Sequence, residues 1–312
     1  MKKIAVLEGN SALQRTLFFD RFNPGAVNRA QKMTFSAGGK GANFCRALLA
    51  TGDVCGVLLH FSGGENGKKA DSFLEKEGIR VISTMVEKET RCCTTCLDPH
   101  SDSMTELIEP SFPPAEAEKS AFLAALEEFL LNEEVAGCAI TGSLPDGTDP
   151  VTYYQWAEKV LACGKPLLMD IVKGVGKILP LPGKKILKIN REELARLTGE
   201  EDLFKGMEAL LHSTSLYALG ITDGPGRAFL GAEGKIWSFA IPQLSHVASP
   251  LGCGDSVSAF FFRGILAGEA PEKAFAAALG AGCANCLTPE PAVFSMEEAL
   301  RFGKDVKITV VK

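Results

Sequence analysis

Short apolar runs alternate with helical patterns along most of the chain, and no other feature restricts the fold as strongly. Buried strands are expected at residues 3–7, 54–59, 80–85, 138–141, 166–170, 186–189 and 215–221. Helices are expected at residues 42–50, 67–77, 115–132, 151–163 and 191–197. Repeated strand-then-helix units predict an α/β fold with a mainly parallel central sheet that helices cover on both faces. Ligands of such sheets bind at the carboxyl ends of the strands.

Two pairs of β-rich runs interrupt this rhythm. Residues 16–22 and 27–35 flank the turn signal Asn23-Pro24-Gly25, and residues 90–97 and 103–108 flank a polar stretch at 98–102. Each pair predicts a hairpin. Together the two hairpins predict one small sheet over a site.

The chain shows no internal repeat and no low-complexity linker. We therefore expect a single domain, 1–312, with a discontinuous β lid formed by about residues 10–36 and 88–110. Its last part predicts an antiparallel edge hairpin at 229–239, helices at 255–267 and 271–286, and a strand at 306–311.

Composition excludes some classes of partner. At 312 residues and 46% hydrophobic content the chain can bury a large core, and its net charge of -5 with scattered Lys and Arg argues against nucleic acid. No apolar run reaches the ~18 residues of a membrane helix. Glu8 and Gly9 end the first apolar run too early for a signal peptide. A soluble, cytoplasmic protein with no membrane partner is expected.

The ten cysteines include two Cys-x-x-Cys spacings, Cys93/Cys96 and Cys283/Cys286, which are compatible with zinc or redox chemistry. The second pair lies in an alanine-rich stretch, where cysteine serves as a small core residue. Without a secretory signal, disulfides are not expected either. We assign these cysteines no metal site.

The sharpest chemical signal is Gly252-Cys253-Gly254-Asp255, which directly precedes a helical pattern. Backbone N–H groups of such a loop can converge on an anion at the helix N-terminus. A carboxylate beside that anion is misplaced unless it removes a proton or meets a metal. The loop is not a dinucleotide fingerprint, because Val257 stands where the third glycine is required.

A second glycine-rich segment, Gly38-Gly39-Lys40-Gly41-Ala42-Asn43, also opens a helix, so its backbone can approach a ligand closely. It is not a Walker A loop, because Gly41 follows Lys40 where a hydroxyl residue is needed. Standing alone, the segment favours a flexible turn and a helix cap over a ligand site.

Other candidates each have two readings. Asn190 and Glu193 fit a helix-capping box, and they equally fit a water-bound Mg²⁺ on a nucleotide. Arg29 and Arg91, one in each hairpin, are either solvated or directed under the lid, where they would bind a phosphate. The four histidines show no ligand spacing.

Taken together, these segments resemble the ribokinase-like, PfkB-type carbohydrate kinases over nearly the whole chain. The resemblance rests on five ordered motifs, which are Gly38 to Asn43, Gly142-Ser143-Leu144-Pro145, Lys188 to Glu193, Thr222-x-Gly224 and Gly252 to Asp255. Asn23 to Arg29 and Glu89-Thr90-Arg91 further resemble the branch of 1-phosphofructokinases and tagatose-6-phosphate kinases.

The resemblance implies an ATP- and Mg²⁺-dependent kinase that phosphorylates a hydroxyl of a phosphorylated ketohexose, such as fructose 1-phosphate or tagatose 6-phosphate. It implies that Asp255 is the general base and that the amides of Gly252, Cys253 and Gly254 stabilise the moving phosphoryl group. By analogy, Asn190 and Glu193 assist the metal. The nucleotide site would contain Lys188, Asn190, Thr222 and Gly224. The sugar site would contain Gln14, Gly38, Gly39, Lys40, Asn43 and Ser143, with Arg29 and Arg91 on the sugar's phosphate.

Three positions depart from the family pattern. Gln14 replaces the aspartate expected to grip sugar hydroxyls, Cys253 replaces the usual alanine, and Arg227 replaces a glycine after Gly224. An amide forms no charge-assisted hydrogen bonds, so two alternatives stay open. These are a kinase of a nonphosphorylated sugar or nucleoside and a noncatalytic sugar-phosphate sensor. A homodimer through the lid is expected, and dependence on a monovalent cation stays open.

Overall fold

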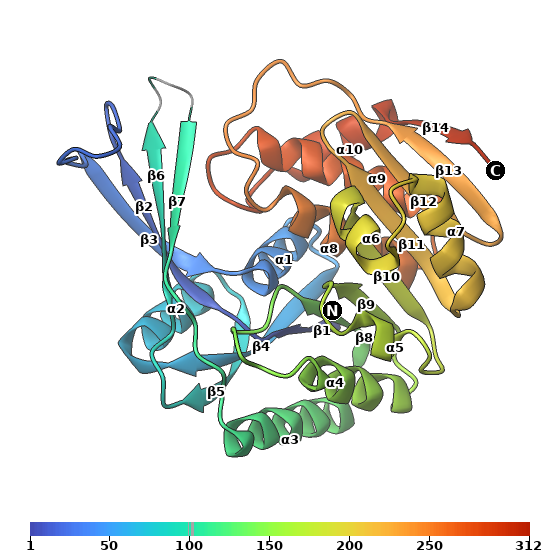
Figure 1. The fold of residues 1–312 in the computed structure, drawn as a ribbon, viewed down its shortest axis with the longest axis horizontal. Helices are drawn as coiled ribbons and strands as arrows, with labels where there is room; N and C mark the ends of the chain where they lie inside the picture. The colour runs from blue at the N-terminus through green and yellow to red at the C-terminus, as the bar shows by residue number, and fades with distance from the viewer. Residues whose placement is uncertain (99, 101–102) are drawn as a thin grey trace.

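The protein has the predicted α/β fold, with a mainly parallel central sheet. The computed structural model describes residues 1–98, 100 and 103–312, and within these the main sheet has the order β14-β13-β12-β11-β10-β9-β8-β1-β4-β5 (Figure 1). All neighbours from β11 to β5 pair in parallel. The parallel strands are β1 Lys2–Glu8, β4 Val54–Gly63, β5 Arg80–Val86, β8 Val135–Thr141, β9 Leu167–Asp170, β10 Lys185–Asn190 and β11 Leu216–Asp223.

The other end of the sheet is antiparallel. The expected hairpin forms from β12 (Arg227–Ala232) and β13 (Lys235–Ala240), and β14 (Lys307–Val310) pairs with β13. The hairpin is therefore not the edge of the sheet, because the C-terminal strand adds outside it. A local pattern predicts a strand but cannot say which neighbour it pairs with.

Helices cover both faces of the main sheet. Alternate residues of β1 show why, because Ile4 and Val6 enter one core while Ala5 and Leu7 enter the other. The first core packs under α1 Lys40–Leu49, α2 Gly64–Lys76, α8 Cys253–Leu266, α9 Pro271–Cys286 and α10 Met296–Asp305. The second packs under α3 Glu116–Asn132, α4 Val151–Ala162, α5 Val175–Ile178, α6 Arg191–Thr198 and α7 Leu203–Ser213.

Of these helices, α5, α7 and α10 were not expected from the sequence. Start signals exist for two of them, because the Asp202 side chain accepts a hydrogen bond from the Lys205 amide (2.9 Å) and Ser295 precedes α10. Over the residues that the structure describes, no helix has the length and apolar character needed to cross a membrane.

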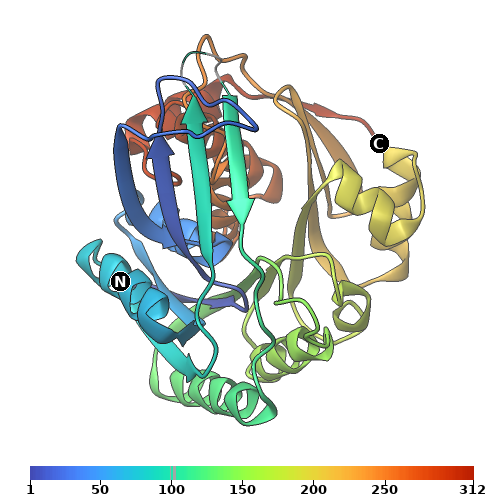
Figure 2. The same cartoon turned by 60° about the vertical axis from the view of Figure 1, so that its left-hand side comes forward.

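The two predicted hairpins join in a second sheet that stands apart from the helical layers, with the order β3-β2-β6-β7 (Figures 1 and 2). Its strands are β2 Ala12–Phe18, β3 Lys32–Gly38, β6 Cys92–Asp98 and β7 Ser103–Ile108. Each hairpin is antiparallel, and β2 pairs with β6 in parallel, so that Leu13 faces Cys92 and Phe18 faces Leu97.

The predicted boundaries of the first hairpin were wrong. Its strands begin and end nearer the main sheet, and residues 19–31 form a long loop rather than a tight turn. The Asn28 side chain provides hydrogen-bond partners for the backbone of this loop. It accepts a hydrogen bond from the Asn23 amide and donates to the carbonyls of Asn23 and Ala26. The turn predicted at 98–102 includes residues 99, 101 and 102, which lie outside the described residues.

Candidate active site

The two glycine-rich segments meet at the carboxyl ends of the central strands. Gly252 is the N-cap of α8 at φ 79°, a conformation that glycine adopts without strain, and Asp255 lies in the first turn. Asp255 is 7% exposed, and its Oδ2 accepts a hydrogen bond from Asn43 Nδ2 of α1 at 2.8 Å. Thus Asp255 and Asn43, predicted separately as base and sugar ligand, belong to one site.

A second buried carboxylate, Asp170 at the end of β9, organises the charges around this site. Lys40 Nζ lies 2.9 Å from its Oδ1, and Lys188 Nζ lies 3.6 Å from its Oδ2. Ser258 of α8 donates a hydrogen bond to the same Oδ2 at 2.6 Å. Asp170 therefore links α1, β10 and α8, and it fixes the two lysines that the sequence assigned to different ligands.

The two carboxyl groups have very different acidities. Burial raises the pKa of Asp255 to about 6, where Lys40 opposes the rise and the Asp170 carboxylate adds to it. Burial would also raise the pKa of Asp170, but the ammonium groups of Lys188 and Lys40 outweigh it and hold that pKa at about 2. The Asp170 carboxylate in turn raises the pKa of Lys40 above its usual range. Asp170 is thus a fixed charge, whereas Asp255 can exchange a proton near neutral pH.

The glycine-rich start of α1 is built around an internal carboxylate. Glu8, 1% exposed at the end of β1, accepts hydrogen bonds from the Gly41 amide (3.0 Å) and from Ser11 Oγ (3.1 Å). At Gly39, with φ 118°, a Cβ would lie 2.3 Å from Glu8 Oε1. Within this glycine-rich segment, the Gly41 amide is therefore bonded to the chain's own Glu8.

The start of α8 lies next to a lysine. A Cβ at Gly254 would lie 3.1 Å from Lys188 Nζ, so the lysine ammonium is close to this backbone. The Cys253 amide makes a 3.3 Å bond to the Pro250 carbonyl, so it is partly engaged within the loop. A helix N-terminus with an ammonium group beside it has the charge that favours an anion such as a phosphoryl group.

Asn190 and Glu193 form the predicted capping box at the start of α6. Asn190 Oδ1 accepts from the Glu193 amide and Glu193 Oε2 accepts from the Asn190 amide, both at 2.8 Å. Carboxylate and amide oxygens with lone pairs to spare suit a Mg²⁺ ion that keeps most of its waters. The Glu193 charge contributes to the raised pKa of Lys40, so Glu193 interacts electrostatically with a residue of the site. The donor set therefore fits the metal as well as the cap.

The other predicted nucleotide residues lie on β10 and at the end of the adjacent strand β11. Thr222 of β11 is in register with Asn190 of β10, and Gly224 follows it in a turn at φ 67° with open space around its Cβ position. Lys188 lies two residues before Asn190 on β10 and is 5% exposed. These residues thus share the strand ends that flank the α8 loop.

The predicted sugar residues lie at the base of the small sheet. Gln14 Nε2 donates to Thr95 Oγ1 at 2.8 Å, which ties Gln14 into that sheet. Ser143 Oγ accepts from Asn10 Nδ2 at 3.3 Å, and Arg91 Nη2 donates to the Asn10 carbonyl at 3.1 Å. Asn10, which follows β1, therefore joins two residues that the sequence placed on the sugar.

The two predicted arginines differ in position. Arg91 directly precedes β6, and its Nε is buried with no hydrogen-bond partner among the residues that the structure describes. Arg29 is exposed in the loop 19–31, and within the described residues it forms no hydrogen bond or ion pair with another predicted site residue. The structure therefore brings Arg91 to Asn10, and among the described residues it shows no such contact for Arg29.

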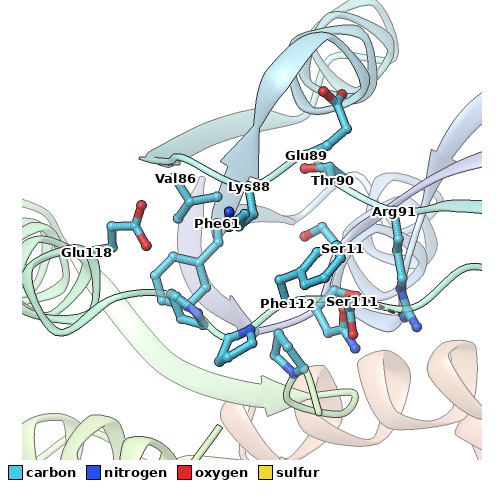
Figure 3. Close-up of a pocket in the computed structure, with 15 residues that line it drawn as sticks. Ser11, Phe61, Val86, Lys88, Glu89, Thr90, Arg91, Ser111, Phe112 and Glu118 are labelled. Atoms are coloured by element: carbon cyan, nitrogen blue, oxygen red, sulfur yellow. Dashed lines mark hydrogen bonds between the residues drawn. The ribbon is translucent and has the colours of Figure 1, made fainter. Parts of the chain in front are cut away.

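A small open pocket with a volume of about 40 Å³ lies beside Arg91. Figure 3 shows the residues that line it. Asn10 and Ser11 line it from the end of β1, and Phe112 lines it from the segment before α3. Asp255 and Lys40 are not among its lining residues, so the pocket does not include the buried acid.

Three residues of this site were missed by sequence reasoning: Glu8, Asn10 and Asp170. Each is at or just after the carboxyl end of a predicted strand, which is the available signal. His60, which was assigned no role, is buried and hydrogen-bonds Ser11 (2.9 Å), and its other ring nitrogen lies 3.0 Å from Asp71. Over the described residues, no group of three or more His, Cys, Asp or Glu side chains could hold a metal.

A buried acid at a glycine-rich helix N-terminus, with lysines around it, has groups that can serve phosphoryl transfer. A family model of pfkB family carbohydrate kinases matches residues 5–299. The chain belongs to this family, and the protein is a sugar kinase; the family implies ATP and a divalent metal as its requirements.

Solved structures share the fold. Escherichia coli phosphofructokinase-2 in complex with fructose-6-phosphate has a TM-score of 0.86 at 20% identity, over 98% of this chain and 99% of that chain. A possible 1-phosphofructokinase from Thermotoga maritima has a TM-score of 0.84 at 20% identity, over 99% and 100%. Arabidopsis thaliana ribokinase complexed with ribose and ATP has a TM-score of 0.73 at 18% identity, over 97% and 99%. The predicted ribokinase-like fold is confirmed.

Proposed function

We propose that the protein transfers the γ-phosphoryl group of ATP to a hydroxyl of a phosphorylated ketohexose of the fructose 1-phosphate or tagatose 6-phosphate type. The observation that carries this proposal is the contact between Asn43 and Asp255, which joins the sugar-binding motif to the acid of the anion loop. Similarity to phosphofructokinases supports the choice of substrate class.

Asp255 is proposed as the general base for the sugar hydroxyl. A buried carboxyl group with a pKa of about 6 is ionised at neutral pH and is a stronger base than an exposed aspartate. Phosphoryl transfer passes through a loose transition state, so proton removal comes late and needs only a well-placed base.

The surrounding charges are proposed to stabilise the phosphoryl group in transit. The Gly254 amide and the Lys188 ammonium lie together at the start of α8, where developing negative charge is expected. The Lys40 ammonium group pairs with Asp170 and lowers the pKa of Asp255. We propose that it also binds substrate oxygens. Asp170 positions both lysines and does not exchange its own proton, because its pKa is about 2.

Asn190 and Glu193 are proposed to hold Mg²⁺ through water. The metal, when bound, neutralises charge on the nucleotide phosphates. Lys188, Thr222 and Gly224 are proposed to bind the nucleotide, because they lie on β10 and at the end of β11 beside the α8 loop.

Gly38, Gly39, Lys40, Asn43, Ser143 and Gln14 are proposed to bind the sugar, and Arg91 its phosphate. The buried, unpaired Nε of Arg91 lacks a hydrogen-bond partner within the part of the chain that the structure describes, and a phosphate oxygen would supply one. Arg29, which is exposed in the loop 19–31, is proposed as a second ligand of that phosphate.

A nonphosphorylated sugar is the second candidate substrate. Gln14 supports it, since an amide stands where the phosphoketohexose branch has an aspartate, and that amide is already bound to Thr95.

We further propose that the chain is one domain whose small sheet is a lid of about residues 10–36 and 88–110, and that two lids pair in a homodimer. Large apolar side chains are exposed on this sheet, with Met33 at 54%, Leu107 at 54% and Ile108 at 60%. Gel filtration of Met33→Lys/Leu107→Lys tests the dimer, because charges on the pairing face would yield monomers. A dimer that persists in this variant argues for another interface.

The substrate is tested by ADP release from ATP and Mg²⁺ with a panel of sugars and sugar phosphates. The proposal expects the highest kcat/KM with a phosphorylated ketohexose, and ADP release lowered by about 10² to 10⁴-fold in Asp255→Asn with the same substrate. Greater kcat/KM with a free sugar or nucleoside would select the second candidate.

A further inference from the structure

Two cysteine thiols meet at the anion loop. Cys253 is the first residue of α8, Cys286 is the last residue of α9, and their sulfur atoms lie 2.8 Å apart. Both side chains are partly exposed. Sequence reasoning treated Cys286 as a core residue paired by spacing with Cys283, whereas its partner in space is Cys253.

The two sulfurs are close to disulfide geometry. A disulfide bond is about 2.05 Å long, so the sulfurs need to approach by less than about 1 Å. Asn285, which is fully buried, donates to Cys253 Sγ at 3.1 Å and to the Leu251 carbonyl at 2.7 Å. The thiol pair is therefore held by the same side chain that holds the anion loop.

The pair also has the protonation chemistry of a reactive dithiol. The Cys253 thiol donates a hydrogen bond that lowers the pKa of Cys286. The same hydrogen bond raises the pKa of Cys253, so Cys253 keeps its proton when Cys286 has lost its own. The thiolate is the nucleophile in thiol oxidation, so a shared proton favours attack by one sulfur and leaves the other ready to resolve the product.

We propose that Cys253 and Cys286 are a reversible oxidation site, at which a peroxide closes a disulfide that switches off the kinase. One thiolate attacks hydrogen peroxide and becomes a sulfenic acid, with hydroxide leaving as water. The second thiolate then displaces the sulfenic oxygen as another water. The two thiols lose two electrons and two protons in total, and the peroxide is reduced to two waters. A dithiol reductant reverses the step by thiol–disulfide exchange.

Formation of the disulfide would lower the rate of catalysis by displacing the start of α8. Cys253 is two residues before Asp255, and its backbone is part of the helix N-terminus proposed to stabilise the phosphoryl group. A misplacement of about 1 Å in such a site can cost on the order of 10²-fold in rate. This effect on turnover rests on the proposed function, whereas formation of the cross-link does not.

The cross-link is tested first, without any activity assay. The full-length protein is treated with hydrogen peroxide, the remaining thiols are alkylated, and the peptides are analysed by mass spectrometry. A peptide pair joined through Cys253 and Cys286, with the mass of two hydrogens lost, is expected, and dithiothreitol should abolish it. Absence of this pair, with both thiols alkylated after treatment, overturns the proposal even if the protein proves not to be a kinase.

Activity is the second measurement. Peroxide is expected to lower ADP release by about tenfold or more, with recovery in dithiothreitol. Cys286→Ser should keep the untreated activity and resist peroxide. Cys163→Ser is the matched control, since it removes an exposed thiol elsewhere and should stay sensitive. Equal inactivation of wild type and Cys286→Ser, or a cross-linked enzyme with full activity, refutes the switch.

Discussion

Asn43 Nδ2 donates a 2.8 Å hydrogen bond to Asp255 Oδ2, although the two residues are 212 positions apart. The orientation of the Asn43 amide is fixed from behind, because its Oδ1 accepts from Arg46 Nη1 at 3.0 Å. Arg46 is in turn held by Glu77, whose Oε2 lies 2.6 Å from Arg46 Nε. The amide therefore presents a donor to Asp255, and this donor lowers the pKa of the carboxyl group.

Asp255→Asn should separate activity from stability. Loss of a general base is expected to lower kcat by about 10² to 10⁴-fold. The folded-state pKa of about 6, against an ordinary 3.8, means that ionised Asp255 costs the folded protein about 3 kcal/mol at neutral pH. The neutral asparagine avoids this cost, so Tm should rise above pH 6 and change little near pH 4.

Thermal unfolding at pH 4 and pH 8 together with ADP release checks both effects. Asp20→Asn is the control, because this exposed aspartate should alter neither. Near-normal ADP production by Asp255→Asn would remove Asp255 from the role of base.

The pH dependence of kcat/KM should report Asp255 in the free enzyme. The base is active when ionised, so kcat/KM is expected to rise through pH 6 and then reach a plateau. The Lys40 ammonium lowers this pKa, so Lys40→Met should move the acidic limb to higher pH as well as weaken sugar binding. Profiles of the two proteins, measured with one substrate between pH 5 and 9, provide the comparison. An acidic limb that stays in place in Lys40→Met would contradict the coupling.

The sequence was informative where function is local and less so where it depends on packing. The strand and helix rhythm, the α8 loop and the Asn190/Glu193 cap follow from neighbouring residues, and all are present in the structure. Asp170 could be placed at a strand end, but its two lysine partners come from positions 40 and 188, which only the parallel sheet order brings together.

The partner of Glu8 could not be predicted from the sequence either. Its charge suggested only the end of a strand, because nothing local indicates that the Gly41 amide bonds its carboxylate. The parallel contact between β2 and β6 was equally out of reach, since each hairpin pattern describes its own two strands and not the neighbour of the pair.

Arg91→Ala should discriminate between the two candidate substrates. If the sugar carries a phosphate, loss of a guanidinium that binds it should raise KM for the sugar about 10-fold or more, with KM for ATP unchanged. Arg29→Ala should have a smaller effect, because Arg29 is exposed. Arg301→Ala, on the exposed side of α10, is the control. Unchanged KM in Arg91→Ala would favour a nonphosphorylated substrate.

Gly39→Ala should test the internal carboxylate at the start of α1. The new Cβ would lie 2.3 Å from Glu8 Oε1, and the backbone at φ 118° disfavours a side chain in any case. Gly78→Ala is the matched control, because Gly78 also has a positive φ (85°) but has nothing within 4 Å of the Cβ position. We expect a loss of about 1 kcal/mol for Gly78→Ala and of about 3 kcal/mol or more for Gly39→Ala, where the buried Glu8 must also leave the Gly41 amide. Urea denaturation of both variants measures the loss in the free energy of unfolding. Equal losses in the two variants would show that displacing Glu8 does not destabilise the protein.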